Sequence, residues 1–216
     1  MFRNEEKTCL LKTMTETKKA YLEIILGPMF SGKTTELIEI HKTFISSGYQ
    51  VAVINHSTDT RYHETMLSTH DKEMIPCIQT SSIDRIWNYC DLESAYDDLA
   101  AQHMKLRWAD VVLINEAQFF DDLVPCVLDM LKENKKVYVY GLDGDFQRRK
   151  FGFILDLIPY SDATRKKTSF CHYCANGTAG IFTMRLTGET QQTLVGSDNY
   201  APVCRGCYEK RVTSNR

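Results

Sequence analysis

The residues best suited to chemistry are those at positions 27–34, which read Gly-Pro-Met-Phe-Ser-Gly-Lys-Thr. They fill every fixed position of the phosphate-binding pattern G-x-x-x-x-G-K-[ST], the P-loop. Its glycines let backbone N–H groups converge on phosphate oxygens, and a helix that follows adds the partial positive charge of its N-terminus. We expect Lys33 to contact the terminal phosphates of a nucleotide and the Thr34 hydroxyl to ligate Mg²⁺. The alternative is a chance match in a glycine-bearing turn.

A second candidate group is Asn115-Glu116, which ends the apolar run 110–115. In P-loop enzymes the carboxyl end of a neighbouring strand faces the phosphates, and a glutamate there can accept a proton from an attacking hydroxyl or water. The alternative is a surface glutamate that the dipole of a starting helix favours. Asn115 stands where P-loop enzymes commonly carry an aspartate for Mg²⁺. Asp59 and Asp143 are the candidates to supply the missing charge.

Two cysteine pairs form the third group. The segments Cys171-His172-Tyr173-Cys174 and Cys204-Arg205-Gly206-Cys207 are separated by residues 175–203. Two C-x-x-C pairs at this scale are typical of tetrahedral Zn²⁺ bound by four thiolates, a closed and therefore structural site. A redox role for a single pair is the alternative, and His172 is expected on the surface. The predicted zinc ligands are Cys171, Cys174, Cys204 and Cys207.

The elements that position these groups alternate between strand and helix, which predicts an α/β fold with a parallel sheet flanked by helices on both faces. The expected strands are 21–26, 50–54, 110–115 and 137–140, and the expected helices are 33–46, 91–104 and 121–133.

The chain after residue 164 has a different composition, with the cysteine pairs, several glycines and the short β-like runs 181–186 and 191–195. We interpret it as a small zinc-binding β lobe, with the charged run Arg165-Lys166-Lys167 as a solvated linker. The expected organisation is a flexible extension over 1–20, a P-loop domain over 21–164, the zinc lobe over 165–208 and a C-terminal tail over 209–216.

Composition narrows the function. The formal net charge of −2 lacks the basic excess typical of a dedicated nucleic-acid binder. No apolar run is long enough to span a bilayer, and the N-terminus shows no signal-peptide segment. We therefore expect a cytoplasmic protein that binds neither nucleic acid nor membrane, whose cysteines are not disulfide-bonded.

Five aromatic residues lie near the ends of predicted elements: Phe119, Phe120, Phe146, Phe151 and Tyr200. Their faces are suited to sandwiching a nucleobase. The alternative for each one is ordinary packing in the core.

Together these residues resemble the zinc-containing type of the thymidine kinase family, which occurs in animals, bacteria and large DNA viruses. The resemblance spans about residues 21–208. It rests on separate blocks in a specific order: 27–34, Asp59-Thr60-Arg61-Tyr62, Thr69-His70-Asp71, Glu116-Ala117-Gln118-Phe119-Phe120, Leu142-Asp143-Gly144-Asp145-Phe146-Gln147-Arg148, and the cysteine pairs with Tyr200 before the second pair.

The resemblance implies a P-loop kinase domain and a zinc lobe whose "lasso" loop closes over a nucleoside. It also implies transfer of the ATP γ-phosphate to the 5′-hydroxyl of thymidine, and of deoxyuridine, by a homotetramer with Glu116 as catalytic base. The implied nucleotide-binding residues are Gly27, Pro28, Met29, Phe30, Ser31, Gly32, Lys33, Thr34, Asp59, Thr60, Arg61, Asn115 and Gln118. The implied substrate-binding residues are Met29, Phe119, Leu142, Phe146, Phe151, Thr183, Gln192, Thr193, Leu194, Val195, Gly196 and Tyr200.

Two departures from the family pattern stand out. The family usually has an aspartate where this chain has Asn115, and the lasso differs slightly in length on both flanks. Two other functions compete with the kinase. One is a catalytically weakened homologue that binds nucleosides or nucleotides, and the other is a P-loop ATPase with a zinc ribbon that acts on nucleic acid.

Overall fold

A computed structural model describes residues 19–59, 65–69, 72–90, 98–194 and 196–214 of the chain. Six parallel strands form the central sheet in the order β5-β2-β6-β7-β1-β8. The strands are β1 Tyr21–Leu26, β2 Val51–His56, β5 Ile78–Thr80, β6 Val111–Asn115, β7 Lys136–Gly141 and β8 Ala163–Lys166. The helices of this domain are α2 Lys33–Ser46, α3 Asp84–Trp87, α4 Asp98–Trp108 and α5 Leu123–Lys132, with the 3₁₀ turns η1 Ala117–Phe119 and η2 Ile154–Tyr160.

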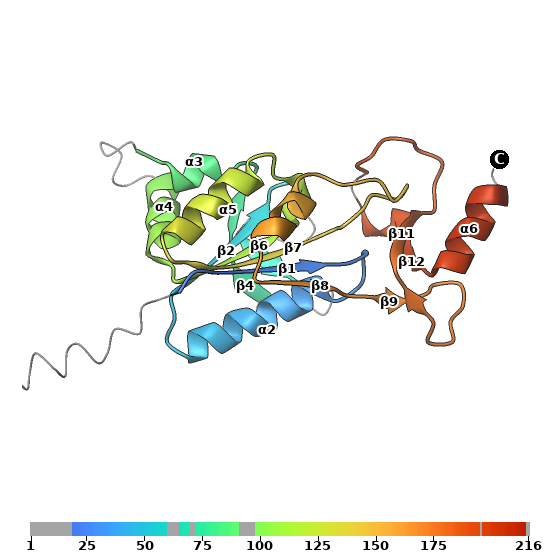
Figure 1. Ribbon diagram of the computed structural model, residues 1–216, viewed down its shortest axis with the longest axis horizontal. Helices are drawn as coiled ribbons and strands as arrows, with labels where there is room; N and C mark the ends of the chain where they lie inside the picture. The colour runs from blue at the N-terminus through green and yellow to red at the C-terminus, as the bar shows by residue number, and fades with distance from the viewer. Residues whose placement is uncertain (1–18, 60–64, 70–71, 91–97, 195, 215–216) are drawn as a thin grey trace, which may run out of the picture.

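Helices cover both faces of this sheet, as predicted, because its central strands are apolar on both sides. On one face α3, α4, α5 and η2 pack against side chains that include Ile24, Ile114 and Val139. On the other face α2 and the hairpin of β3 Met66–Ser68 and β4 Met74–Pro76 cover a second cluster (Figure 1). Each fully buried Leu or Ile in these clusters stabilises the fold by about 1.5–3 kcal/mol.

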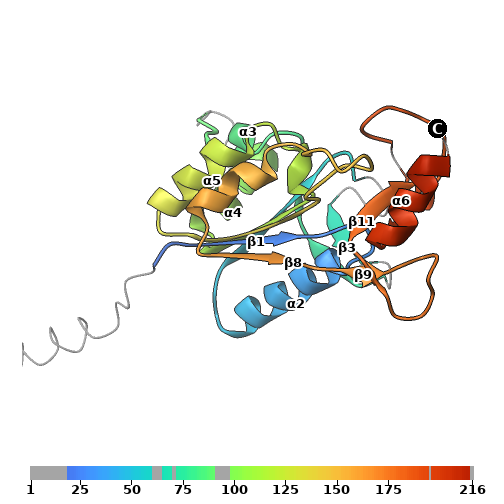
Figure 2. The ribbon, with the colours of Figure 1, turned by 45° about the vertical axis from the view of Figure 1, so that its right-hand side comes forward.

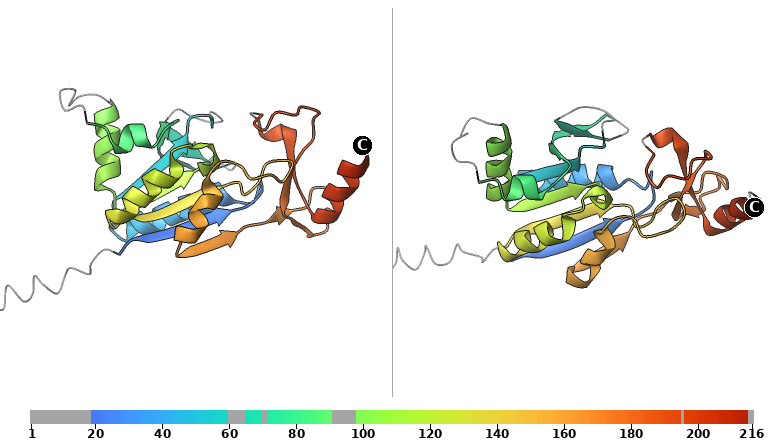
Figure 3. Two further views of the ribbon diagram at one scale, coloured as in Figure 1. Left: turned by 45° about the horizontal axis from the view of Figure 1, so that its top comes forward. Right: turned by 90° about the horizontal axis from the view of Figure 1, so that it is seen from above.

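The chain after β8 forms a small β lobe beyond the carboxyl ends of β1 and β8 (Figures 2 and 3). Its strands are β9 Ser169–Phe170, β10 Ala179–Gly180, β11 Phe182–Arg185 and β12 Tyr200–Val203, followed by α6 Arg205–Ser214. Buried Met184, Val203 and Tyr208 form its apolar centre beside the cysteines. The lobe therefore stands over the edge of the sheet at which parallel α/β proteins bind ligands.

Several predicted elements are confirmed, with small shifts at their ends. The strand 21–26 and the helix 33–46 have the predicted bounds, and β11 falls within the predicted run 181–186. The helix predicted over 91–104 is described from Asp98, and residues 91–97 lie outside the described chain. So do residues 1–18 of the predicted extension. The tail predicted from 209 continues α6 to Ser214.

The strand-like interpretation of 191–195 was wrong for its described residues, 191–194, which form no strand. The carbonyls of Gln191 and Gln192 accept hydrogen bonds from the guanidinium of Arg185 instead of from another strand. The Arg185 side chain therefore takes the place of the neighbouring strand with which a β-strand would pair.

The interpretation of residues 165–167 as a solvated linker was also wrong. Arg165 and Lys166 belong to β8, which pairs with β1. Arg165 bridges Glu23 and Glu36, at 2.6 and 2.7 Å, and Lys167 also pairs with Glu36. Burial opposes ionisation of Glu36, yet these hydrogen bonds hold its pKa below the usual value. The run thus fastens the approach to the lobe against β1 and α2.

Candidate active site

The P-loop follows β1 directly and leads into α2. Phe30 and Gly32 have positive φ values of 62° and 72°, which turn successive backbone N–H groups inward. The Lys33 ammonium donates to the carbonyls of Gly27 and Pro28, at 3.0 and 2.8 Å. Lys33 is therefore held across the loop that a phosphate would occupy.

Gly27 is required at the start of this loop for two reasons. Its φ of 152° is one that side chains rarely adopt, and a Cβ there would lie 2.8 Å from both the Lys167 carbonyl oxygen and Ser31 Oγ. The P-loop and the strand-end leading to the lobe are consequently in close backbone contact.

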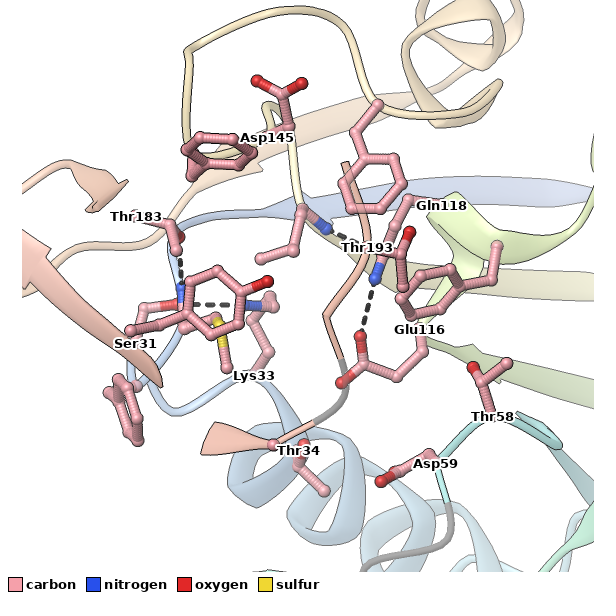
Figure 4. Close-up of a pocket in the computed structure, with 18 of the residues that line it drawn as sticks. Ser31, Lys33, Thr34, Thr58, Asp59, Glu116, Gln118, Asp145, Thr183 and Thr193 are labelled. Carbon is pink, nitrogen blue, oxygen red and sulfur yellow. Dashed lines mark hydrogen bonds between the residues drawn. The ribbon is translucent and has the colours of Figure 1, made fainter. Parts of the chain in front are cut away.

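One cavity, partly open to solvent, is lined both by the P-loop and by residues of the lobe. Clefts between two parts of a protein are common binding sites for small molecules. The predicted residues that line it are Met29, Phe30, Ser31, Gly32, Lys33, Thr34, Asp59, Glu116, Gln118, Phe119, Leu142, Phe146, Phe151, Thr183, Gln192, Thr193, Leu194, Gly196 and Tyr200. In Figure 4, Lys33 and Thr34 at the start of α2, Asp59 after β2 and Glu116 after β6 converge on one part of it.

Not every predicted residue lies on this wall. Gly27 and Pro28 lie behind the P-loop surface, and Asn115 is buried behind Glu116. Thr60, Arg61 and Val195 fall outside the described residues. The wall also includes residues that were not predicted as ligands: Thr35, Thr58, Ser68, Thr69, Gly144 and Asp145. Thr69, Gly144 and Asp145 belong to the sequence blocks that carried the resemblance, which was the available signal for them.

Glu116 follows β6, which is separated from β1 by β7. Glu116 nevertheless reaches the cavity. Its backbone is left-handed, with φ of 50°, a conformation uncommon for a non-glycine residue. Gln118 Nε2 donates to Glu116 Oε2 at 2.7 Å, and Gln118 Oε1 accepts from the Leu142 N–H at 2.9 Å. The amide of Gln118 is thus fixed at both ends, and it orients the carboxylate of Glu116 (Figure 4).

Asn115 is connected to the cavity only through other side chains. It is 2% exposed, and its Nδ2 donates to Asn55 Oδ1 at 2.8 Å. Asn55 Nδ2 in turn donates to Asp59 Oδ2 at 3.3 Å, and Asp59 lines the cavity. The other candidate for a compensating charge, Asp143, pairs with Lys166 at 2.5 Å instead. Of the two aspartates, Asp59 therefore has the position to act on a bound nucleotide.

Aromatic side chains of the P-loop domain form part of the cavity wall. Phe119 and Phe151 meet edge to face with centroids 5.3 Å apart. Phe120, by contrast, is fully buried and packs against His56, which confirms core packing for that aromatic residue. The Met29 N–H of the P-loop donates to Thr183 Oγ1 of β11 at 3.0 Å, so the loop and the lobe are joined inside the cavity.

Asp145 of the P-loop domain binds the loop that follows β11. Its side chain is fully buried, which raises the pKa of its carboxyl, but hydrogen bonds from the Arg149 N–H, Gln192, the Arg149 side chain and the Gln147 N–H outweigh that effect and hold the pKa below the usual value. The Gln192 bond measures 3.0 Å. The carboxylate is therefore an ionised anchor for Gln192.

The four predicted zinc ligands lie together, with their sulfur atoms all within 4.8 Å of one another. Cys174 Sγ is 3.8 Å from Cys204 Sγ and 3.6 Å from Cys207 Sγ. A tetrahedron with Zn–S bonds of about 2.3 Å places its sulfurs roughly 3.8 Å apart, so the set fits one Zn²⁺ with no position left open. His172 is exposed, as expected.

No helix among the described residues combines the length and the apolar character that crossing a bilayer requires.

Comparison with known proteins agrees with this site. A family model described as thymidine kinase matches residues 20–208. Thymidine kinase a of Arabidopsis thaliana is 41% identical over 190 residues, which are 87% of this chain and 74% of the plant protein. The thymidine kinase of Yaba monkey tumor virus (strain VR587) is 37% identical over 90% of this chain and 97% of its own length. The cytosolic thymidine kinase of Bos taurus is 36% identical over 90% of this chain and 74% of its own. The chain belongs to the thymidine kinase family.

Proposed function

We propose that the protein transfers the γ-phosphate of ATP to the 5′-hydroxyl of thymidine, and of deoxyuridine, giving the nucleoside monophosphate. The observation that carries the proposal is one cavity that is lined by the P-loop, by Glu116, by aromatic side chains and by residues of the lobe. Membership of the family supports the same reaction.

The phosphate end would hold the ATP. Backbone N–H groups of the P-loop and the N-terminus of α2 favour the negative charge of a triphosphate. Lys33 would leave its carbonyl partners for the terminal phosphates. Thr34 and Asp59 are the residues with the position to hold Mg²⁺, which when bound neutralises charge on the phosphates.

Glu116 would act as the general base. A 5′-hydroxyl is a weak nucleophile, and a carboxylate within hydrogen-bond reach orients it and accepts its proton as the new P–O bond forms. Gln118 keeps one carboxylate oxygen of Glu116 in place through its 2.7 Å hydrogen bond. The positive φ of Glu116 aims the side chain past the end of β7 and into the cavity.

The lobe would hold the nucleoside, with Zn²⁺ as a structural ion. Phe119, Phe151 and Phe146 supply apolar walls, and backbone groups near Thr193 would pair with the pyrimidine edge. A site built on fixed hydrogen bonds rejects bases that leave those groups without partners. Purine deoxynucleosides are therefore expected to be very poor substrates. We further propose a cytoplasmic protein that assembles as a homotetramer.

The test is a phosphotransfer assay with ATP, Mg²⁺ and each natural deoxynucleoside in turn. Thymidine and deoxyuridine should give monophosphate, with kcat/KM far above that of deoxyadenosine. ATP hydrolysis stimulated by DNA but not by thymidine would favour the nucleic-acid ATPase, and nucleoside binding without turnover would favour the weakened homologue.

A variant ties the activity to the P-loop. Lys33→Ala should lower kcat by roughly 10²–10³-fold, because it removes a cation directed at charge that develops in the transition state. Lys42→Ala is the matched control, since Lys42 lies on the same helix, pairs with Glu73 and is 59% exposed. Near-normal kcat in a folded Lys33→Ala protein would exclude the P-loop from the reaction.

A further inference from the structure

Arg185, at the end of β11, is buried beneath the loop of residues 186–194, although the predicted site did not include it. Only 7% of the residue is exposed. Its Nη1 donates to the carbonyls of Glu189, at 2.9 Å, and Gln191. Its Nη2 donates to the Gln192 carbonyl at 3.2 Å and to the Tyr200 hydroxyl at 2.6 Å. One guanidinium thus gathers three carbonyls of the loop.

The same guanidinium packs against the cavity wall. Its Cζ lies 3.8 Å from the centroid of the Phe146 ring and 5.1 Å from that of Tyr200, and both rings line the cavity. Cation–π contacts of this kind strengthen when they are shielded from water. Arg185 therefore stands between the loop and the aromatic groups that face a ligand, without lining the cavity itself.

The Tyr200 hydroxyl extends this network to the middle of the loop. It accepts hydrogen bonds from Arg185 and from the Leu194 N–H, at 3.3 Å, and donates to the Leu194 carbonyl at 3.2 Å. Both lone pairs and the proton of the hydroxyl are then used. The position of Leu194, which lines the cavity, consequently depends on Tyr200 and through it on Arg185.

The hydrogen-bond partners of Arg185 indicate that its burial depends on the folded loop. Within the described residues its hydrogen bonds go to neutral oxygens, and Arg185 forms no ion pair there, although the desolvation of a buried cation costs several kcal/mol. A hydrogen bond from Thr187 and, more weakly, the charge of Arg185 lower the pKa of the exposed Glu189 on the loop itself. Carbonyl dipoles can compensate for the desolvation only while the loop stays folded around the guanidinium. Residues i and i+2 of a strand share a face, so Thr183, bonded to the P-loop, lies on the same face of β11 as Arg185.

We propose that Arg185 is a positioning residue that holds the loop 186–194 closed over the nucleoside end of the cavity and thereby sets affinity for the nucleoside. The assignment of that end to a nucleoside rests on the proposed function. The closure of the loop by Arg185 does not, because it follows from the contacts alone.

The kinetic test compares Arg185→Met, which keeps much of the apolar volume, with Arg185→Lys. Arg185→Met should raise KM for thymidine roughly 10–100-fold, the equivalent of losing one or two hydrogen bonds to a charged donor. KM for ATP and kcat should change only a few-fold. Arg185→Lys should fall between the wild type and Arg185→Met, because an ammonium cannot reproduce the planar fork.

Arg211→Met is the matched control. Arg211 lies in the same lobe and stacks on Tyr173 at 3.4 Å, on the exposed surface of α6. It should leave both KM values unchanged. Tyr200→Phe should raise KM for thymidine as well, and its effect should be non-additive with Arg185→Met, because the two side chains share one network.

A second readout does not depend on activity. Glu189 is exposed and is the only glutamate between residues 186 and 199, so a glutamate-specific protease reports opening of the loop by a cut at that position. Arg185→Met should be cut there several-fold faster than the wild type or Arg211→Met, and thymidine should slow cutting of the wild type. Zinc content and Tm are measured on the same samples.

The outcomes separate the two proposals. Unchanged KM for thymidine together with unchanged cutting at Glu189 would overturn the role of Arg185. Equal rises in both KM values with loss of zinc would mean that Arg185 only supports the fold of the lobe. If Arg185→Met does not fold, the same comparisons are made with Arg185→Lys. A wild type that phosphorylates no nucleoside would refute the proposed function, whereas faster cutting of Arg185→Met would still support the closure.

Discussion

Glu116 combines a strained backbone with an oriented carboxylate. Holding a non-glycine residue in the left-handed region costs on the order of 1 kcal/mol or more, and such positions persist where the surrounding structure fixes them. Here β6 fixes the residue before Glu116, and Gln118 fixes the carboxylate itself. In this backbone conformation the side chain of Glu116 extends across the end of β7, which lies between β6 and β1.

Glu116→Gln tests the role of this side chain in proton transfer. The variant keeps the shape and loses the base, so kcat for thymidine should fall about 10²–10⁴-fold while KM changes little. Steady-state kinetics with a rapid-quench measurement of the chemical step will check it. Glu39→Gln, an exposed change on α2, is the control and should be silent. Wild-type kcat in Glu116→Gln with chemistry rate-limiting would move the base elsewhere, with Asp59 the next candidate.

At this scale the sequence predicted residues whose chemistry is encoded in local spacing. Lys33, Glu116 and the four cysteines lie in short patterns that carry their own physical meaning. Arg185 does not, because an arginine within the run 181–186 gives no indication of which distant carbonyls it will meet. The link from Asn115 through Asn55 to Asp59 joins the end of β6 to the segment 55–59, which is distant in the sequence, so spacing along the chain could not reveal it.

Among the elements, the turn before η2 has the tightest constraint. Gly152 has φ of 59°, and a Cβ there would lie 2.0 Å from the Gln118 carbonyl oxygen. Gly141, at the end of β7, likewise leaves room for the Gln118 side chain, whose Oε1 would lie 2.6 Å from a Cβ. These glycines allow the segment that carries Glu116 to pass over the end of the intervening strand.

Gly152→Ala should therefore displace Gln118 and the carboxylate that it orients. We expect the free energy of unfolding to fall by about 1–3 kcal/mol, the usual cost of overpacking. We also expect kcat to fall by a larger factor than KM for ATP changes. Chemical denaturation and kinetics measure the two effects. Gly177→Ala is the control for backbone strain alone, because Gly177 has φ of 85° but an open surrounding. Equal losses of stability and of kcat in Gly152→Ala and Gly177→Ala would refute a steric clash between residue 152 and Gln118.

Predicting elements from the sequence succeeded where a segment's own pattern decides its structure. The run 21–26 is mostly apolar and is followed by Gly27, and Gly48 lies just beyond the helix that ends at Ser46. The order of the strands is different, because it depends on pairing between distant segments. The insertion of β7 between β1 and β6 was not predicted, and neither was the backbone pairing with β1 that makes β8 a strand where a linker was expected.

At the scale of the whole molecule, two bodies with separate apolar centres meet at the cavity. The P-loop domain has two large clusters, one on each face of its sheet. The lobe has a small one beside the cysteines. Its few buried side chains cannot supply much stability, as is usual for very small units, so a bound metal is expected to hold it together.

Cys174→Ser should release zinc and unfold the lobe while leaving the P-loop domain folded. Elemental analysis should show about one zinc per chain in the wild type and a large loss in the variant. Phosphotransfer should fall because the nucleoside end of the cavity is lost. Cys90→Ser, at an exposed cysteine outside the cluster, is the control and should keep its zinc. Pure wild-type protein without zinc would contradict the assignment.

The hydrogen bond from the Met29 N–H to Thr183 Oγ1 has a thermodynamic consequence. This bond connects the P-loop, which would bind ATP, to the lobe, which would bind the nucleoside. Any shift of the lobe that accompanies nucleoside entry changes the energy of the P-loop, and the coupling is reciprocal: each substrate alters the affinity of the other by the same factor. Positive coupling would favour the ternary complex over the enzyme with ATP alone. It would limit wasteful hydrolysis of ATP in the absence of an acceptor.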